Sequence, residues 1–151
     1  MNFYRISKYS PNQPIEKGCT SEEWTSISDV KAEQMSTYYR TEKNYIDTVE
    51  KILIKSGNTT VTICYLENHN ATKWQEGDQL NREKAREFIE DCLREKCWGQ
   101  LNSDGFIWEA GYDYYMHIGC SLALSEISQI ANESNLFVEE WHRIEKINNN
   151  E

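Results

Sequence analysis

The residues that could do chemistry are concentrated in one short segment, residues 108–116, which holds four aromatic rings and two carboxylates within nine residues. Glu109 and Asp113 are the two carboxylates, and His117 follows directly. Two carboxylates can do general acid–base or glycosidase chemistry when a specific environment raises the pKa of one of them. One hypothesis is therefore a small hydrolase or nuclease that uses His117 with Glu109 or Asp113, although such a pair also arises by chance among 25 acidic residues.

The same segment can instead form a binding surface. As a strand, it would alternate its side chains between two faces: Tyr112, Tyr114 and Met116 on one, and Asp113, Tyr115 and His117 on the other. Aromatic residues are favoured at interface centres, and acidic groups attract a basic partner over a long range. We therefore expect a surface for a basic protein partner formed by Asp104, Trp108, Glu109, Tyr112, Asp113 and Tyr115. The alternative is an ordinary core strand, because aromatic residues are enriched in strands.

Other catalytic signatures are missing from the sequence, which has no GxSxG elbow, Walker loop or GxGxxG turn. The histidines His69, His117 and His142 lack the paired spacing of a zinc site, so we expect no metal and no cofactor. Cys120 could be a nucleophile near a helix N-terminus, but a buried thiol is the better interpretation. Five reduced and mostly buried cysteines are expected in a reducing compartment.

Charge and hydropathy exclude several classes of protein. The net charge of −9 argues against a protein whose main task is to grip nucleic acid, because such binding neutralises phosphates with cations. The chain has no apolar run long enough for a transmembrane helix, and residues 1–10 lack the apolar stretch of a signal peptide. We therefore expect a cytoplasmic protein that does not associate with membranes.

Hydrophobic periodicity predicts the elements that must position these residues. One apolar face at helical spacing runs through 41–56 and ends at Gly57, Asn81 can cap a second helix that reaches 97, and Ser121 can cap a third. Strands are predicted at 2–9, 59–66, 98–101, 106–110, 112–118 and 136–141. Residues 10–20 and 67–79 are expected to be loops, residues 21–40 to be irregular with one short helix, and the polar tail after Ile147 to fray.

Three amphipathic helices need a sheet to cover, which favours an α+β fold. We expect a single domain over residues 1–151, with one mixed or mainly antiparallel sheet and three to four helices packed on it. The hairpin over 98–118 favours antiparallel pairing in the centre of the sheet.

Four segments of the chain resemble a set found in small bacterial proteins: residues 4–9 (YRISKY), 23–30 (EWTSISDV), 111–116 (GYDYYM) and 136–139 (LFVE). The set resembles the immunity proteins of polymorphic toxin and contact-dependent growth inhibition systems. The resemblance implies a protein that is not an enzyme and that binds a cognate toxin domain, often a basic nuclease, to block its active site or substrate path. A subunit of a larger assembly that exposes its aromatic strand is a further hypothesis.

Overall fold

The structure, a computed structural model, describes residues 1–10, 24–69 and 72–147. Within this part of the chain, seven strands form one antiparallel sheet in the order β3-β2-β4-β5-β6-β1-β7. The strands are β1 (Asn2–Ser7), β2 (Thr60–Glu67), β3 (Gln79–Asn81), β4 (Trp98–Ser103), β5 (Phe106–Ala110), β6 (Met116–Cys120) and β7 (Phe137–Glu140). The helices are α1 (Met35–Lys55), α2 (Arg82–Leu93) and α3 (Leu124–Glu133), with short 3-10 turns η2 (Ile27–Asp29), η3 (Ala32–Gln34) and η4 (Tyr112–Tyr114).

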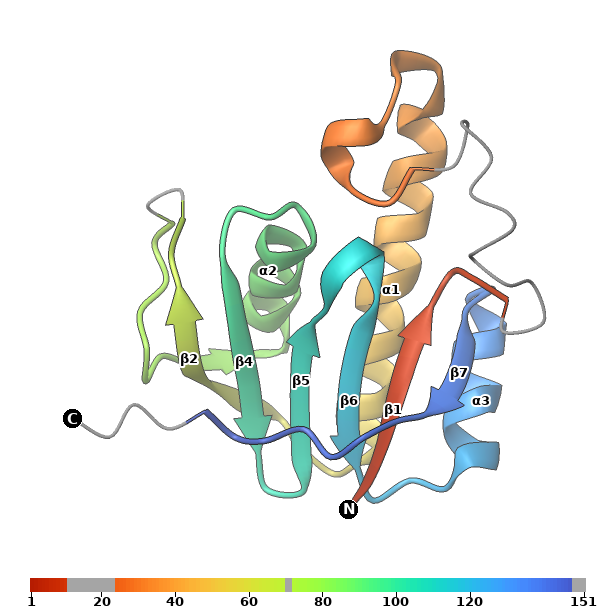
Figure 1. Cartoon of the computed structure of the whole chain (residues 1–151). Coiled ribbons are helices and arrows are strands. Elements are labelled where there is room, and N and C mark those ends of the chain that lie inside the picture. The colour runs from red at the N-terminus through yellow and green to blue at the C-terminus, as the bar shows by residue number, and fades with distance from the viewer. Residues whose placement is uncertain (11–23, 70–71, 148–151) are drawn as a thin grey trace.

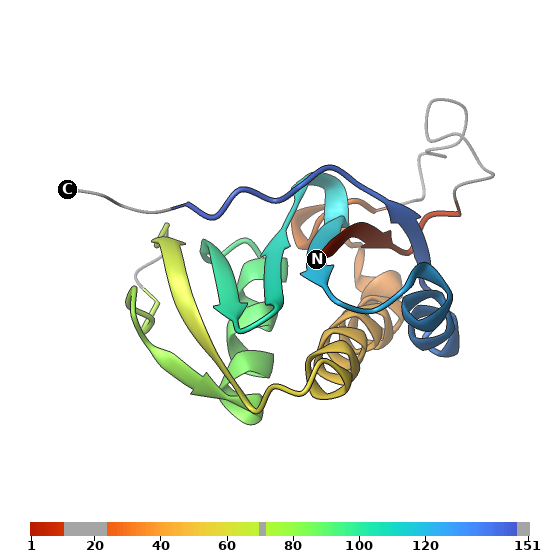
Figure 2. The same ribbon diagram turned by 90° about the horizontal axis from the view of Figure 1, so that it is seen from below.

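The helices α1, α2 and α3 lie together on one face of the sheet (Figure 1). On the opposite face a single C-terminal segment crosses the strands, so that helices, sheet and this segment form successive layers in Figure 2. We call this segment, residues 141–147, the strap. The predicted α+β fold with one mainly antiparallel sheet is confirmed.

Strand register decides which side chains enter the core. Trp108 and Tyr4 both pair with Ile118, and all three are at most 2% exposed on the helix-covered face. The neighbouring row points to the other face, because side chains alternate along each strand. In that row, Arg5 pairs with His117, His117 with Glu109, and Glu109 with Gln100. We call these four cross-strand neighbours the polar row.

The helices end in a common way. In each, the residue after the C-cap has a positive φ (83° at Gly57, 60° at Glu95 and 57° at Asn135), and two backbone bonds close the last turn. This is the Schellman arrangement, which satisfies carbonyls that the helix leaves open. Glu95 ends α2 at Leu93, so the prediction that this helix reaches 97 is wrong.

Several other boundaries also differ from the sequence predictions. Helix α1 begins at Met35 and not at 41, and Ala123, not Ser121, is the N-cap of α3. The short strand β3 falls at the end of a predicted loop. Asn81 does cap α2, accepting a hydrogen bond from the Lys84 amide at 2.9 Å.

The predicted strand 112–118 is instead a 3-10 turn followed by β6. The expectations for 10–20, apart from Ser10, and for the tail after 147 fall outside the described residues.

Candidate functional site

The strap is held to the open face of the sheet by backbone and side-chain bonds. The Trp141 amide donates to the Phe3 carbonyl at 2.9 Å. The buried amide of Gln100 donates to the Glu145 carbonyl and accepts from the Ile147 amide, both at 3.1 Å. Its Nε2 also donates to Glu109 Oε2 at 2.7 Å. Gln100 therefore ties the strap to the polar row.

Beside the strap lies a cleft of about 390 Å³, which we call the aromatic cleft. Three of its walls are the rings of Tyr65, Trp98 and Tyr112, and its carboxylates are Glu67 and Glu109. The rings of Tyr65 and Trp98 meet edge to face with centroids 5.4 Å apart. Trp98 Nε1 donates to the Ala110 carbonyl at 2.7 Å, which fixes the indole in place.

His117 and Glu109 line this cleft with side chains that are only 15% and 20% exposed. Nδ1 of His117 is 3.7 Å from Glu109 Oε1, and this buried nitrogen has no hydrogen-bond partner among the described residues. Burial raises the pKa of the Glu109 carboxyl, against a lowering by the Gln100 hydrogen bond. Burial, assisted by the positive charge of Arg5, lowers the pKa of His117 to about 4. The imidazole is thus neutral at neutral pH.

A stack of flat groups keeps Arg5 out of the cleft. The His117 ring is nearly parallel to Trp141, with centroids 5.5 Å apart. The guanidinium of Arg5 lies between the rings of Trp141 and Tyr115, 4.0 and 4.2 Å from their centroids, and its Nε donates to Glu139 at 2.8 Å. Arg5 is therefore fully engaged beside the cleft and does not neutralise Glu109.

The turn η4 presents Tyr112 at the mouth of the cleft. Asp113 and Tyr114 have φ of 56° and 66°, a strained conformation for residues with a side chain. Burial of Tyr114 against Tyr45, whose hydroxyl donates to the Tyr114 carbonyl at 2.8 Å, holds this strain in place. As a result the side chain of Tyr112 is 93% exposed.

The structure brings only part of the predicted partner surface together. Glu109 and Tyr112 line the cleft. Asp113 is exposed on η4, and Tyr115 is half-buried against Arg5. Asp104 lies in the β4–β5 turn at the opposite end of β5, roughly 17 Å of strand away.

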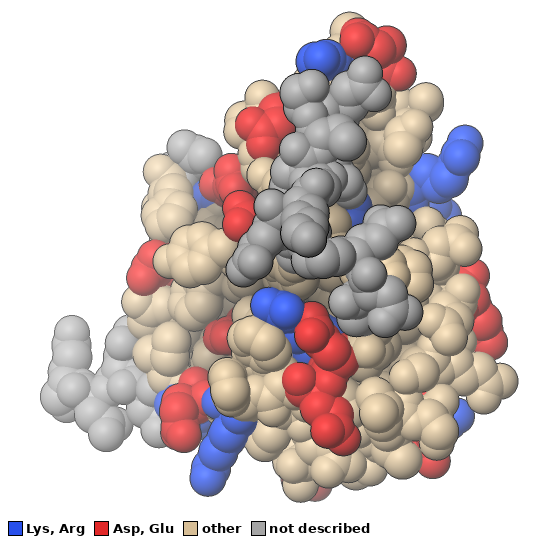
Figure 3. Space-filling model, turned by 45° about the vertical axis from the view of Figure 1, so that its right-hand side comes forward, with Lys and Arg blue, Asp and Glu red and all other residues tan. Residues whose placement is uncertain are grey.

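The prediction for Trp108 is wrong, since the side chain is fully buried and faces the helices. The expected alternation holds for Tyr114 and Met116, which are buried, and fails for Tyr112 because η4 interrupts the strand. Nor do the acidic residues collect into one patch on the side seen in Figure 3, where Asp and Glu are scattered between basic and uncharged residues.

Sequence reasoning missed Tyr65, Trp98, Gln100 and the strap. Trp98 and Gln100 fall in a predicted strand, and the register that brings Tyr65 opposite Gln100 follows an irregularity in β2 between Ile63 and Tyr65. Only pairing between distant strands places these residues beside Glu109. No local sequence pattern could have indicated it.

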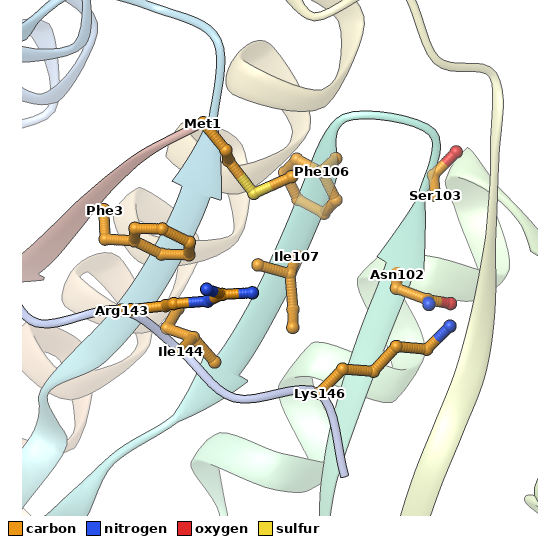
Figure 4. Close-up of a pocket in the computed structure, with 9 residues that line it drawn as sticks. All are labelled: Met1, Phe3, Asn102, Ser103, Phe106, Ile107, Arg143, Ile144 and Lys146. Carbon is orange, nitrogen blue, oxygen red and sulfur yellow. The ribbon is translucent and has the colours of Figure 1, made fainter. Parts of the chain in front are cut away.

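A second hollow, of about 510 Å³, has the opposite charge (Figure 4). Phe3, Ile107 and Ile144 give it apolar walls, and the strap contributes Arg143 and Lys146. The open face of the sheet thus carries an acidic, aromatic cleft and a basic, apolar hollow.

In residues 1–10, 24–69 and 72–147, no group of three or more His, Cys, Asp or Glu could hold a metal ion. None of the described helices has both the length and the apolar composition to span a bilayer. The sulfur atoms of Cys92 and Cys97 are 3.7 Å apart and buried; Cys120 is also buried, Cys64 is partly exposed, and Cys19 lies outside the described residues.

The chain matches no protein-family model, and no curated protein or solved structure matches it.

Proposed function

We propose that this chain is an immunity protein of a polymorphic toxin or contact-dependent growth inhibition system. In this proposal it acts in the cytoplasm of the producing cell, where it binds a basic toxin domain and neutralises it. The observation that carries the proposal is the exposed ring of Tyr112, held by a strained turn at the mouth of a cleft that contains Glu67 and Glu109.

Three features support partner binding at this place. An exposed aromatic ring on a preorganised turn gives contact area at low entropic cost, and tyrosine is enriched among the residues that dominate binding energy. The net charge of −9 would speed encounter with a basic partner. The resemblance of residues 111–116 to immunity proteins includes η4 itself.

The test is affinity capture of the tagged chain co-expressed with the products of its neighbouring genes. We expect an equimolar complex with a basic toxin domain that weakens as salt is added. Tyr112→Ala should weaken it about tenfold or more, whereas Tyr39→Ala, which removes another exposed tyrosine, should leave it unchanged. Failure of the well-folded chain to capture any toxin domain would count against the proposal.

A second candidate function is acid–base catalysis by His117 and Glu109. It is favoured by their separation of 3.7 Å, the unpartnered Nδ1 and the opposite directions of their pKa shifts. Asp113 does not line the cleft, so Glu109 is the only carboxylate of the original pair that remains beside His117. A hydrolase or nuclease activity lost in His117→Gln, with the free energy of unfolding unchanged at neutral pH, would favour this function over the first.

A further inference from the structure

We propose that the aromatic cleft binds the guanidinium group of one arginine side chain of the partner protein, placed between Glu109 and the rings of Trp98 and Tyr112. This inference rests on the proposed function, because it takes the partner to be a protein. To that function it adds which chemical group of the partner protein the cleft binds.

Hydrogen-bond acceptors in the cleft are available for such a group. Glu109 uses Oε2 to accept from Gln100, and its Oε1 has no hydrogen bond to the described residues. Nδ1 of His117, a neutral imidazole, is also unpartnered, but it is buried, so a ligand N–H can reach it only after the side chain shifts. Glu109 Oε1 is therefore the acceptor open to a ligand, and a carboxylate oxygen suits a ligand with several N–H donors in a fork.

The charge of the cleft selects a cation. Glu67 and Glu109 line it, and no Lys or Arg is among its described lining residues. Glu67 is already engaged by the Tyr65 hydroxyl at 2.8 Å and by His69 Nε2 at 3.3 Å, so Glu109 is the carboxylate left for a ligand. The nearby Arg5 is held between Tyr115 and Trp141. The other hollow on the same face of the sheet has Arg143 and Lys146 instead, so an anion would be directed there.

The rings favour arginine over lysine. A planar guanidinium stacks on aromatic faces and is more weakly hydrated than an ammonium, which lowers the cost of its entry into a partly enclosed site. Trp98 and Tyr65 are fixed in an edge-to-face pair, and Tyr112 is free to close over a ligand. The volume of about 390 Å³ is near the lower end of ligand-binding pockets and leaves ample room for one arginine side chain.

The test is titration of the full chain with N-acetyl-arginine methylamide and with the matching lysine compound. The readout is the indole N–H signal of Trp98 in a nitrogen–proton correlation spectrum. We expect the arginine compound to shift this signal and to bind about tenfold tighter than the lysine compound. Glu109→Gln should weaken binding about tenfold or more, and Asp104→Asn should have no effect.

Tyr112→Ala provides a second variant in which the fold is not at risk, because the ring is exposed, and it should weaken binding several-fold. No shift of the Trp98 signal, or equal binding of the arginine and lysine compounds, would overturn the inference. Much tighter binding of free arginine would overturn the assignment to a partner side chain, since it would indicate a small-molecule site.

Capture of the toxin domain separates the two proposals. If the cleft binds the arginine compound but the chain captures no toxin domain, only the proposed function fails. If a toxin domain is captured equally well by the wild type, Glu109→Gln and Tyr112→Ala, only the arginine site fails.

Discussion

Glu109 and His117 face each other on β5 and β6, 3.7 Å apart, and yet they do not form a charged pair. An ion pair would lower the pKa of the carboxyl and raise that of the imidazole. Here burial raises the pKa of Glu109 and lowers the pKa of His117, and the positive charge of Arg5 lowers the pKa of His117 further. The two side chains are therefore polar neighbours in the lining of the cleft, each with unused hydrogen-bonding capacity.

The lowered pKa of His117 predicts that the free energy of unfolding depends on pH in the acidic range. Below its ordinary pKa of 6.5, His117 of the unfolded chain binds a proton, while in the folded chain it stays neutral down to about pH 4. Unfolding thus takes up a proton in this window, and stability falls as the pH falls, by about 3 kcal/mol in full. The raised pKa of Glu109 acts in the opposite direction, since its contribution to stability is lost as the pH rises through its folded value.

His117→Gln removes the histidine contribution and leaves the other groups in place. Urea unfolding of both proteins between pH 6.5 and 4 should show the wild type losing more stability than the variant. A difference between them that stays constant across this window would contradict the assignment of a depressed pKa to His117.

The buried carboxylate of Glu42 predicts a large effect of a single change. It accepts hydrogen bonds from Arg94 Nε and Nη2, at 2.9 and 2.8 Å, and from the Tyr38 hydroxyl at 2.7 Å. Arg94→Met leaves this carboxylate buried without its cation and should lower the free energy of unfolding by about 3–5 kcal/mol. Lys51→Met, which breaks the exposed pair with Glu133, should cost less than about 1 kcal/mol. Denaturant titration gives both values; similar losses would be inconsistent with this account.

The end of α2 predicts a stabilising substitution. Glu95 has a φ of 60° at the position where helices favour glycine. Glu95→Gly removes the strain on the side chain and should raise the free energy of unfolding by about 0.5–1 kcal/mol. Lys84→Gly, at an exposed position in the first turn of the same helix, should instead lower it by up to about 1 kcal/mol. Thermal unfolding of the two variants should move in opposite directions from the wild type.

Gly99 predicts a steric limit in the strand that carries Trp98. A Cβ atom here would lie 2.6 Å from the Tyr65 carbonyl oxygen and 2.9 Å from Phe88 Cζ. Gly99→Ala should therefore cost about 1–3 kcal/mol, because the carbonyl belongs to the paired strand and cannot move alone. Gly105→Asn is the control, since it adds a side chain to open space at a positive φ that asparagine tolerates. Equal effects in urea unfolding would refute the steric explanation.

Local patterns in the sequence determined the elements and the class of fold. The apolar spacing in 41–56 identified most of α1, Gly57 identified its end, and Asn81 identified the start of α2. Each is a short-range signal, because caps and helical periodicity depend on residues a few positions apart. The end of α2 was missed because Glu95 takes a conformation for which its residue type gives no cue.

The site, in contrast, was decided by tertiary structure. Alternation along a strand divides its side chains into two sets, but only the register of pairing decides which set faces the helices. A shift by one residue moves every side chain to the other face. Register buries Trp108 and turns Glu109 toward His117 and Gln100. The strap that Gln100 holds comes from the far end of the chain. The sequence by itself determined which residues could do chemistry; the pairing of distant strands decided which of them meet, because those contacts depend on the whole chain.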